Sequence, residues 1–221
     1  MKIHAGDVLR CALQRGPASA LGDQINILFN LLQEAELTFE QLWWFSSSPH
    51  WYHVHLNKFL HLSEEEIGRL LRQLLASRGE FALQGREPLQ PISLCLRGCS
   101  QVTGTLLDVL IRGNCTLISR VDISHCPRLS CDTARASLGT IQQEALSHLS
   151  LRGCVWMKEE DYTPLFPLGL AALEHLDLSC SPPHLSDSGL LQALKETAGG
   201  KVNVEGCPRL TSKVQQRASD L

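Results

Sequence analysis

The sequence predicts an α/β repeat protein in which about five strand-plus-helix units stack into a right-handed solenoid, preceded by an α-helical N-terminal region. Three observations support this fold class. Cysteines recur at a nearly constant spacing, with gaps of 27, 28, 26 and 27 residues, an apolar couplet precedes each of them, and short phrases between them repeat. A unit of this size cannot bury its own apolar face, so it must stack on its neighbours. The recurring cysteines are Cys99, Cys126, Cys154, Cys180 and Cys207.

The apolar couplets place hydrophobic residues at alternate positions, as in a strand with one buried face. They are Leu94 and Leu96, Val121 and Ile123, Leu149 and Leu151, Leu176 and Leu178, and Val202 and Val204. We predict that the cysteines form a buried ladder of free thiols, because a free cysteine behaves as a small apolar residue. In one unit Cys180 follows Leu178 by two places instead of three. Either Ser181 takes the ladder position there, or the turn is one residue shorter.

The phrases between the cysteines also repeat. Leu-Arg-Gly-Cys ends at both Cys99 and Cys154, and Cys-Pro-Arg-Leu begins at both Cys126 and Cys207. These residues resemble the cysteine-containing class of leucine-rich repeats, which occurs in the F-box and leucine-rich-repeat proteins of ubiquitin ligases. The resemblance implies a leucine-rich-repeat solenoid over residues 88–214, followed by a C-terminal tail at 215–221.

No repeat unit is visible before Pro88, and residues 1–87 instead predict three helices. The first covers 18–36, and the second runs from Thr38, as N-cap, to a point before Pro49. The third begins at Ser63, which can form a capping box with Glu66. Its apolar stripe contains Ile67, Leu70, Leu71, Leu74 and Leu75.

On this third helix, Arg69, Arg72 and Arg78 are expected on the solvent side.

The segment from Gly79 to Pro88 is predicted to be a linker, because glycine and proline interrupt helices. Trp43, Trp44 and Trp51 lie within ten residues of one another, in the second predicted helix and just after it. Such a cluster is typical of a small core or of a partner-binding patch.

Residues 21–55 resemble a degenerate F-box. The residues close to the positions of that motif are Leu31, Leu37, Leu42 and Trp51. The resemblance implies that they dock a Skp-type adaptor, and through it a cullin. The sequence departs from the motif at Leu21-Gly22, where the family has Leu-Pro. The alternative is a helical cap that covers the first repeat.

Composition narrows the range of partners. The net charge is −3 and the pI is near 6.3, so nothing in the overall charge favours nucleic acid or an anionic membrane. No apolar run is long enough for a membrane span, and the N-terminus lacks the pattern of a secretory signal. Free cysteines indicate a reducing compartment, so we expect a cytoplasmic or nuclear protein. We expect a monomer within a larger protein complex.

Catalytic motifs are missing from the sequence. His50, His53, His55 and His61 cluster, but no CxxC or HExxH spacing accompanies them, and we interpret them as solvated or interfacial side chains. No glycine-rich phosphate loop and no Gly-x-Ser-x-Gly elbow is present. We therefore expect no enzymatic activity, no cofactor and no metal.

The polar positions of the strands should form the concave face of the solenoid. Candidate partner-binding residues on this face are Arg97, Arg120, Asp122, His148, Arg152, His175, Asp177 and Lys201. The three arginines are suited to bidentate pairing with carboxylates or phosphates. A merely solvated sheet surface is the alternative. The sequence thus favours a non-enzymatic protein-interaction module. The family resemblance implies the substrate-recognition subunit of a cullin-type ubiquitin ligase, and the alternative is a scaffold or assembly factor unrelated to ubiquitin.

Overall fold

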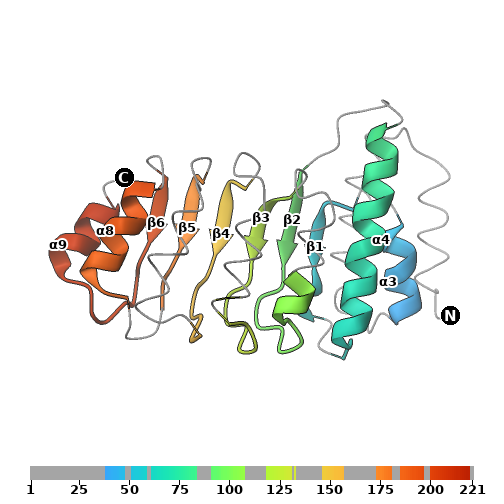
Figure 1. The fold of residues 1–221 in the computed structure, drawn as a ribbon, viewed down its shortest axis with the longest axis horizontal. Helices are drawn as coiled ribbons and strands as arrows, with labels where there is room; N and C mark the ends of the chain where they lie inside the picture. Colours follow the sequence, from blue (N-terminus) through green and yellow to red (C-terminus); the bar gives the residue numbers. More distant parts are fainter. Residues whose placement is uncertain are drawn as a thin grey trace, which may run out of the picture.

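The protein is an elongated α/β molecule built on one sheet, as the computed structural model in Figure 1 shows. The structure describes residues 38–47, 51–58, 61–83, 91–107, 118–130, 132, 146–156, 173–180, 185–196 and 200–219. None of the helices in these ranges combines the length and the apolar character that a membrane span requires.

The sheet has six strands, all parallel, and their spatial order is their order in the chain. The strands are β1 (His53–His55), β2 (Ile92–Cys95), β3 (Ile118–Asp122), β4 (His148–Ser150), β5 (His175–Asp177) and β6 (Lys201–Asn203). Parallel neighbours require a crossover connection between each strand and the next. The predicted α/β organisation is therefore confirmed.

The expectation of five strands, with none before residue 88, is wrong. Strand β1 pairs with β2, and Val54 lies opposite Leu94. Val54 and Leu56 form the same buried couplet as the later units. The cysteine pattern does not reveal this unit because Phe59 stands three places after Leu56, where the later units have cysteine. The sheet is thus continuous across residue 88.

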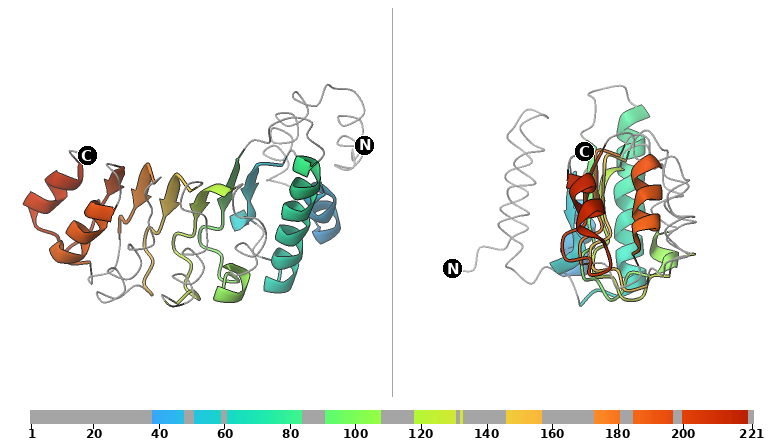
Figure 2. Two further views of the ribbon diagram at one scale, coloured as in Figure 1. Left: turned by 45° about the horizontal axis from the view of Figure 1, so that its top comes forward. Right: turned by 90° about the vertical axis from the view of Figure 1, so that its left-hand side faces the viewer.

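The core consists of the couplets and the helices that cover them. Every couplet residue from β2 to β6 is at most 5% exposed. Helices α4 (Glu64–Leu83) and α8 (Asp187–Glu196) run along the same side of the sheet (Figure 2). At the C-terminal end, α9 (Ser212–Ser219) packs against β6. The segment expected to be a tail from residue 215 therefore includes most of a helix, and Ala218 is buried in it.

Two of the three helices predicted near the N-terminus are confirmed. Helix α3 (Phe39–Ser46) begins directly after Thr38, whose carbonyl accepts a hydrogen bond from the amide of Leu42. Helix α4 begins with the predicted capping box: the Ser63 amide donates to Glu66 Oε2 at 2.8 Å, and the Glu66 amide donates to Ser63 Oγ at 3.3 Å. The helix expected at 18–36 falls outside the described residues.

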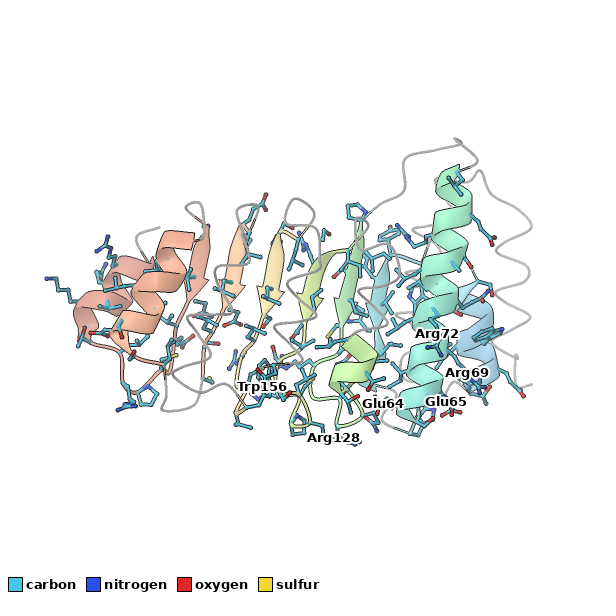
Figure 3. All side chains as sticks on the ribbon, viewed as in Figure 1. Glu64, Glu65, Arg69, Arg72, Arg128 and Trp156 are labelled. Carbon is cyan, nitrogen blue, oxygen red and sulfur yellow. The ribbon has the colours of Figure 1, made fainter. Side chains whose placement is uncertain are left out.

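The predicted apolar stripe of α4 is buried, but one arginine is placed differently from the expectation. Arg69 and Arg72 are exposed, as expected (Figure 3). Arg78 is fully buried, and this burial lowers the pKa of its guanidinium to about 10. It lies four residues after Leu74, so helical spacing places it on the buried face. The helix also continues beyond Gly79 to Leu83, so residues 79–83 are helical and not the expected linker, whose remaining residues lie outside the described ones.

The cysteine ladder is confirmed for four of its five members. Cys99, Cys126, Cys154 and Cys207 are at most 2% exposed. Each thiol donates to a backbone carbonyl of the preceding unit, at sulfur–oxygen distances of 3.2 to 3.6 Å. Burial raises the thiol pKa to about 12 in Cys99, Cys126 and Cys154. These thiols therefore serve as neutral core groups.

Cys180 is not a ladder residue. The second residue after each couplet adopts a left-handed conformation, with φ between 52° and 71°. Glycine suits this conformation because it has no Cβ. The five residues are Gly98, His125, Gly153, Cys180 and Gly206. Cys180 thus stands at the turn position that glycine holds elsewhere and is exposed, whereas Ser181, at the ladder position in the sequence, lies outside the described residues.

Candidate functional site

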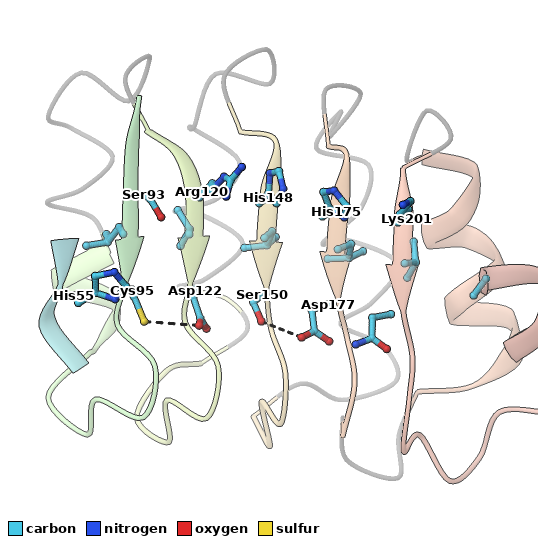
Figure 4. A pocket seen from close by; sticks show the side chains of 17 residues that line it. His55, Ser93, Cys95, Arg120, Asp122, His148, Ser150, His175, Asp177 and Lys201 are labelled. Atoms are coloured by element: carbon cyan, nitrogen blue, oxygen red, sulfur yellow. Dashed lines mark hydrogen bonds between the residues drawn. The ribbon is translucent and has the colours of Figure 1, made fainter. Parts of the chain in front are cut away.

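A groove of about 600 Å³ runs across the strands on the polar face of the sheet (Figure 4). Strand geometry creates it, because alternate side chains of each strand point away from the core. The residues that line it come from all six strands and from α9. Ala218 of α9 is the lining residue at the C-terminal end, next to β6.

The groove has two rows of side chains on opposite sides, as Figure 4 shows. The basic row consists of Arg120 in β3 and of the first residues of β4, β5 and β6, which are His148, His175 and Lys201. The carboxylate row lies two residues further along each strand and consists of Cys95, Asp122, Ser150, Asp177 and Asn203. The in-register parallel pairing of β3 to β6 aligns both rows, so the groove carries the cations Arg120 and Lys201 along one side and the carboxylates Asp122 and Asp177 along the other.

The two histidines of the basic row lie side by side. The ring centroids of His148 and His175 are 4.3 Å apart, with 33° between the ring planes. Partial burial lowers the pKa of His148, and the positive charge of Arg120 lowers it further. The lowered pKa favours the neutral form of His148, which reduces like-charge repulsion between the two neighbouring rings.

Backbone hydrogen bonds hold the carboxylate row in place. Asp122 Oδ1 accepts the Ser124 amide at 2.9 Å, and Asp177 Oδ1 accepts the Ser179 amide at the same distance. Asn203 Oδ1 accepts the Glu205 amide at 3.1 Å. Asp and Asn form such turns with the amide two residues on. The repeated turn therefore fixes the orientation of Asp122, Asp177 and Asn203 in the same way on three strands.

The second oxygen of each aspartate contacts its neighbour on the preceding strand. Cys95 Sγ lies 3.8 Å from Asp122 Oδ2, and Ser150 Oγ lies 3.4 Å from Asp177 Oδ2. The pKa of the Cys95 thiol is raised, first by burial and then by the negative charge of Asp122. A reactive cysteine requires the opposite environment, one that stabilises the thiolate. Cys95 is therefore not an activated nucleophile.

Six of the eight residues expected on the concave face line the groove: Arg120, Asp122, His148, His175, Asp177 and Lys201. Arg97 and Arg152 are not among the lining residues, because they follow the strands at the turns. Of the three arginines that were expected to grip a partner, only Arg120 is in position to do so within the groove.

The residues expected to dock an adaptor are placed differently. Leu42 and Trp51 are at most 1% exposed and belong to the core, so they do not form an exposed docking surface. The Trp51 indole donates to the backbone carbonyl of His53 at 2.9 Å, which places the ring beside strand β1. Leu31 and Leu37 lie outside the described residues.

Two groups near the groove were not predicted from the sequence. His55 lines the groove because β1 is part of the sheet. The sequence does contain a sign of this strand, namely the Val54–Leu56 couplet. It is followed by Leu62-Ser63, a pair that recurs in a later unit as Leu185-Ser186. The second group is Glu174, which directly precedes β5 and whose carboxylate lies near both histidines of the basic row. No sequence motif marks it.

No protein-family model matches the sequence, and no curated protein matches it. Ten chains of solved structures do match. One belongs to the crystal structure of the Rad7–Elc1 complex from yeast, with a TM-score of 0.45 and 17% identity. The match covers 69% of this chain and 42% of that chain, so this protein spans less than half of the length of the structure it matches. A likeness of this extent does not identify a family, and the function must be argued from the groove.

Proposed function

We propose that this protein is a non-enzymatic protein-binding module whose groove holds a segment of a partner protein. The partner segment carries carboxylates along one side, toward the basic row, and Lys or Arg along the other, toward the carboxylate row. The observation that supports this proposal is the separation of charge into two aligned rows across one groove. Complementary charge gives specificity and fixes the orientation of a bound partner.

The dimensions of the groove fit a polypeptide segment. Neighbouring strands lie about 4.8 Å apart, and positions two residues apart on a strand are separated by about 6.6 Å. Charged side chains of a single segment can therefore reach both rows at once. The Asx turns at Asp122 and Asp177 orient that side of the groove in advance. Preorganised groups of this kind favour a defined complex over loose electrostatic attraction.

A protein partner fits the groove better than a nucleic acid does. A phosphate backbone has one sign of charge and would meet the carboxylates of Asp122 and Asp177. The net charge of −3 adds a general repulsion. A polypeptide can present both signs of charge, and it is the occupant to which the two rows are complementary.

The experiment is affinity capture of the full chain from cells under mild lysis, followed by cross-linking and mass spectrometry. We expect a partner whose cross-links map to the groove and whose capture is lost in the double variant Arg120→Glu, Lys201→Glu. The matched control is the double variant Lys213→Glu, Arg217→Glu, which makes the same charge change at two exposed residues of α9 outside the groove. Retained capture by the groove variant, or equal loss with the α9 variant, contradicts the proposal.

A narrower form of the proposal follows from the family resemblance of the repeats. In it, the units coil as a right-handed leucine-rich-repeat solenoid, since parallel crossovers are almost always right-handed. The protein then acts in the cytoplasm or nucleus as the substrate-recognition subunit of a cullin-type ubiquitin ligase. Because Leu42 and Trp51 are buried, the adaptor contact has to use other residues, with Leu37 as the first to test.

The ubiquitin role is tested by the identity of the captured proteins. We expect a Skp-type adaptor and a cullin with the wild-type chain, and their loss with Leu37→Asp. Capture of a groove-bound partner without any cullin component supports the alternative, a scaffold or assembly factor unrelated to ubiquitin. The two proposals can therefore fail independently. The groove variants test only whether the groove binds a protein segment, and the identity of the captured proteins tests the ubiquitin role.

A further inference from the structure

We propose that His148, Glu174 and His175 form a binding site for a divalent transition-metal ion such as Zn²⁺. Each residue offers one ligand atom, and these atoms all lie within 4.8 Å of one another. The sheet brings them together: His148 begins β4, His175 begins β5 directly opposite it, and Glu174 is the residue before β5. This site was not expected from the sequence, which carries no metal-binding motif.

The three side chains can reach coordination geometry by small movements. Zinc bonds of about 2.0–2.1 Å in a tetrahedral arrangement place ligand atoms roughly 3.4 Å apart. The present separations of up to 4.8 Å therefore need to shorten by about 1.4 Å at most. Glu174 and His175 are exposed, so rotation of their side chains meets little resistance from packing.

A hydrogen bond to its neighbour Ser147 also orients His148 for metal binding. The hydroxyl of Ser147 lies 2.8 Å from His148 Nδ1 and 3.1 Å from the carbonyl oxygen of Ser119. A hydroxyl has one proton, and the carbonyl can only accept, so Ser147 donates to Ser119. Ser147 must then accept from Nδ1–H of His148. This assignment leaves the lone pair of His148 on Nε2, and an imidazole held through its other nitrogen is the usual arrangement of a metal ligand.

The donor set selects the class of metal. Two imidazoles and one carboxylate suit Zn²⁺, Cu²⁺ or Ni²⁺, whereas Mg²⁺ and Ca²⁺ require mainly oxygen ligands. The neighbouring cations Arg120 and Lys201 repel any divalent ion, so binding here depends on the coordinate bonds from the imidazoles, which Zn²⁺ forms far more strongly than Mg²⁺. Three protein ligands leave a coordination position for water or for a side chain of a bound partner.

The test is calorimetric titration of the full chain, free of any histidine tag, with Zn²⁺, and a parallel titration with Mg²⁺. We expect saturable binding of one Zn²⁺ at the cluster and no binding of Mg²⁺. His148→Ala and His175→Ala should each weaken the zinc affinity by at least about tenfold, and Glu174→Gln should weaken it less. Titration with Co²⁺ should give no thiolate-to-metal charge-transfer band, because the ligands are nitrogen and oxygen.

Two control variants separate this site from other donors. His125→Asn removes an exposed histidine at a left-handed turn position, where asparagine is tolerated. Cys180→Ser removes the exposed thiol. Both should bind Zn²⁺ like the wild type, and circular dichroism should show all variants folded. Wild-type affinity in folded His148→Ala, loss of binding in Cys180→Ser, or no saturable binding by the wild type would overturn the proposal.

Discussion

The thiol of Cys126 donates a hydrogen bond to the backbone carbonyl of Leu96, one strand earlier, at a sulfur–oxygen distance of 3.2 Å. The same relationship joins Cys99 to Leu56, Cys154 to Ile123 and Cys207 to Leu178. In each case the carbonyl belongs to the second residue of an apolar couplet. The ladder therefore does more than fill space, because each thiol donates to a backbone carbonyl at the strand end, and Leu96 O accepts the Cys99 amide as well as the Cys126 thiol.

The ladder predicts how substitutions at Cys154 affect stability. Cys154→Ala should lower the free energy of unfolding by about 1–2 kcal/mol, since it removes one buried group and one weak hydrogen bond. Cys154→Asp should unfold the protein, because an unpaired carboxylate would be buried. Urea denaturation followed by circular dichroism measures both effects. A fully stable aspartate variant would mean that this position is open to solvent.

The pKa of the ladder thiols predicts a loss of stability at alkaline pH. The folded-state pKa of Cys126 is about 12, against an ordinary value of 9.0. Between these values the unfolded chain releases a proton that the folded chain retains. Stability is therefore fully present below about pH 9 and falls as the pH rises toward 12, by about 1.4 kcal/mol per pH unit for each thiol. Cys126→Ala should reduce this slope by that amount in urea titrations at pH 9 to 11, whereas an unchanged slope would contradict it.

The turn position of Cys180 predicts that it behaves unlike the ladder cysteines. Its thiol is exposed and its backbone has φ of 52°, so Cys180→Gly should keep or raise stability, by up to about 1 kcal/mol. Brief alkylation of the native protein, with each cysteine followed by peptide mass spectrometry, should label Cys180 and spare Cys99, Cys126, Cys154 and Cys207. Equal labelling of Cys126 and Cys180 in the folded protein would show that the ladder is not buried.

A close backbone contact predicts a severe effect at Gly200. A Cβ on Gly200 would lie 2.1 Å from the carbonyl oxygen of Leu173, so the backbone before β5 or β6 would have to move. Gly200→Ala should cost roughly 3 kcal/mol, at the upper end for overpacking. It should also speed amide hydrogen exchange in β6.

Gly98→Ala is the matched control for Gly200→Ala. Nothing lies within 4 Å of a Cβ at Gly98, and its φ is 71°, so this variant bears only the cost of a left-handed conformation, about 1–2 kcal/mol. Similar costs for the two variants, or unchanged exchange in β6 of Gly200→Ala, would argue against the tight contact with Leu173.

Local pattern determined much of the fold. The cysteine period and the alternating couplets were enough to predict strands at the positions of β2 to β6, because one buried face per strand leaves a periodic pattern in the sequence. The capping box at Ser63 and Glu66 likewise placed the start of α4, since its hydrogen bonds are local. The row membership of residues such as Arg120 and Asp122 followed from the same alternation.

Strand β1 shows where pattern failed. Its unit has phenylalanine in place of the marker cysteine, and 40 residues separate Val54 from its partner Leu94. Without the marker cysteine and the regular spacing, the Val54–Leu56 couplet is recognised as a strand only from its pairing with β2 in the structure. The burial of Arg78 was missed for a related reason, because a long side chain on the apolar face of a helix is buried or exposed according to what packs against it.

The sequence by itself determined which side chains leave the core, since alternation along a strand is a property of the local backbone. Only the tertiary structure determines which of these side chains come close to one another. The turn residues Arg97 and Arg152 fall outside the groove, whereas Glu174 comes within reach of His148, although 26 residues separate them. Those distances depend on the register between β4 and β5 and on the side-chain directions at their ends. Hydrogen bonds between strands set that register, and no local sequence pattern records it.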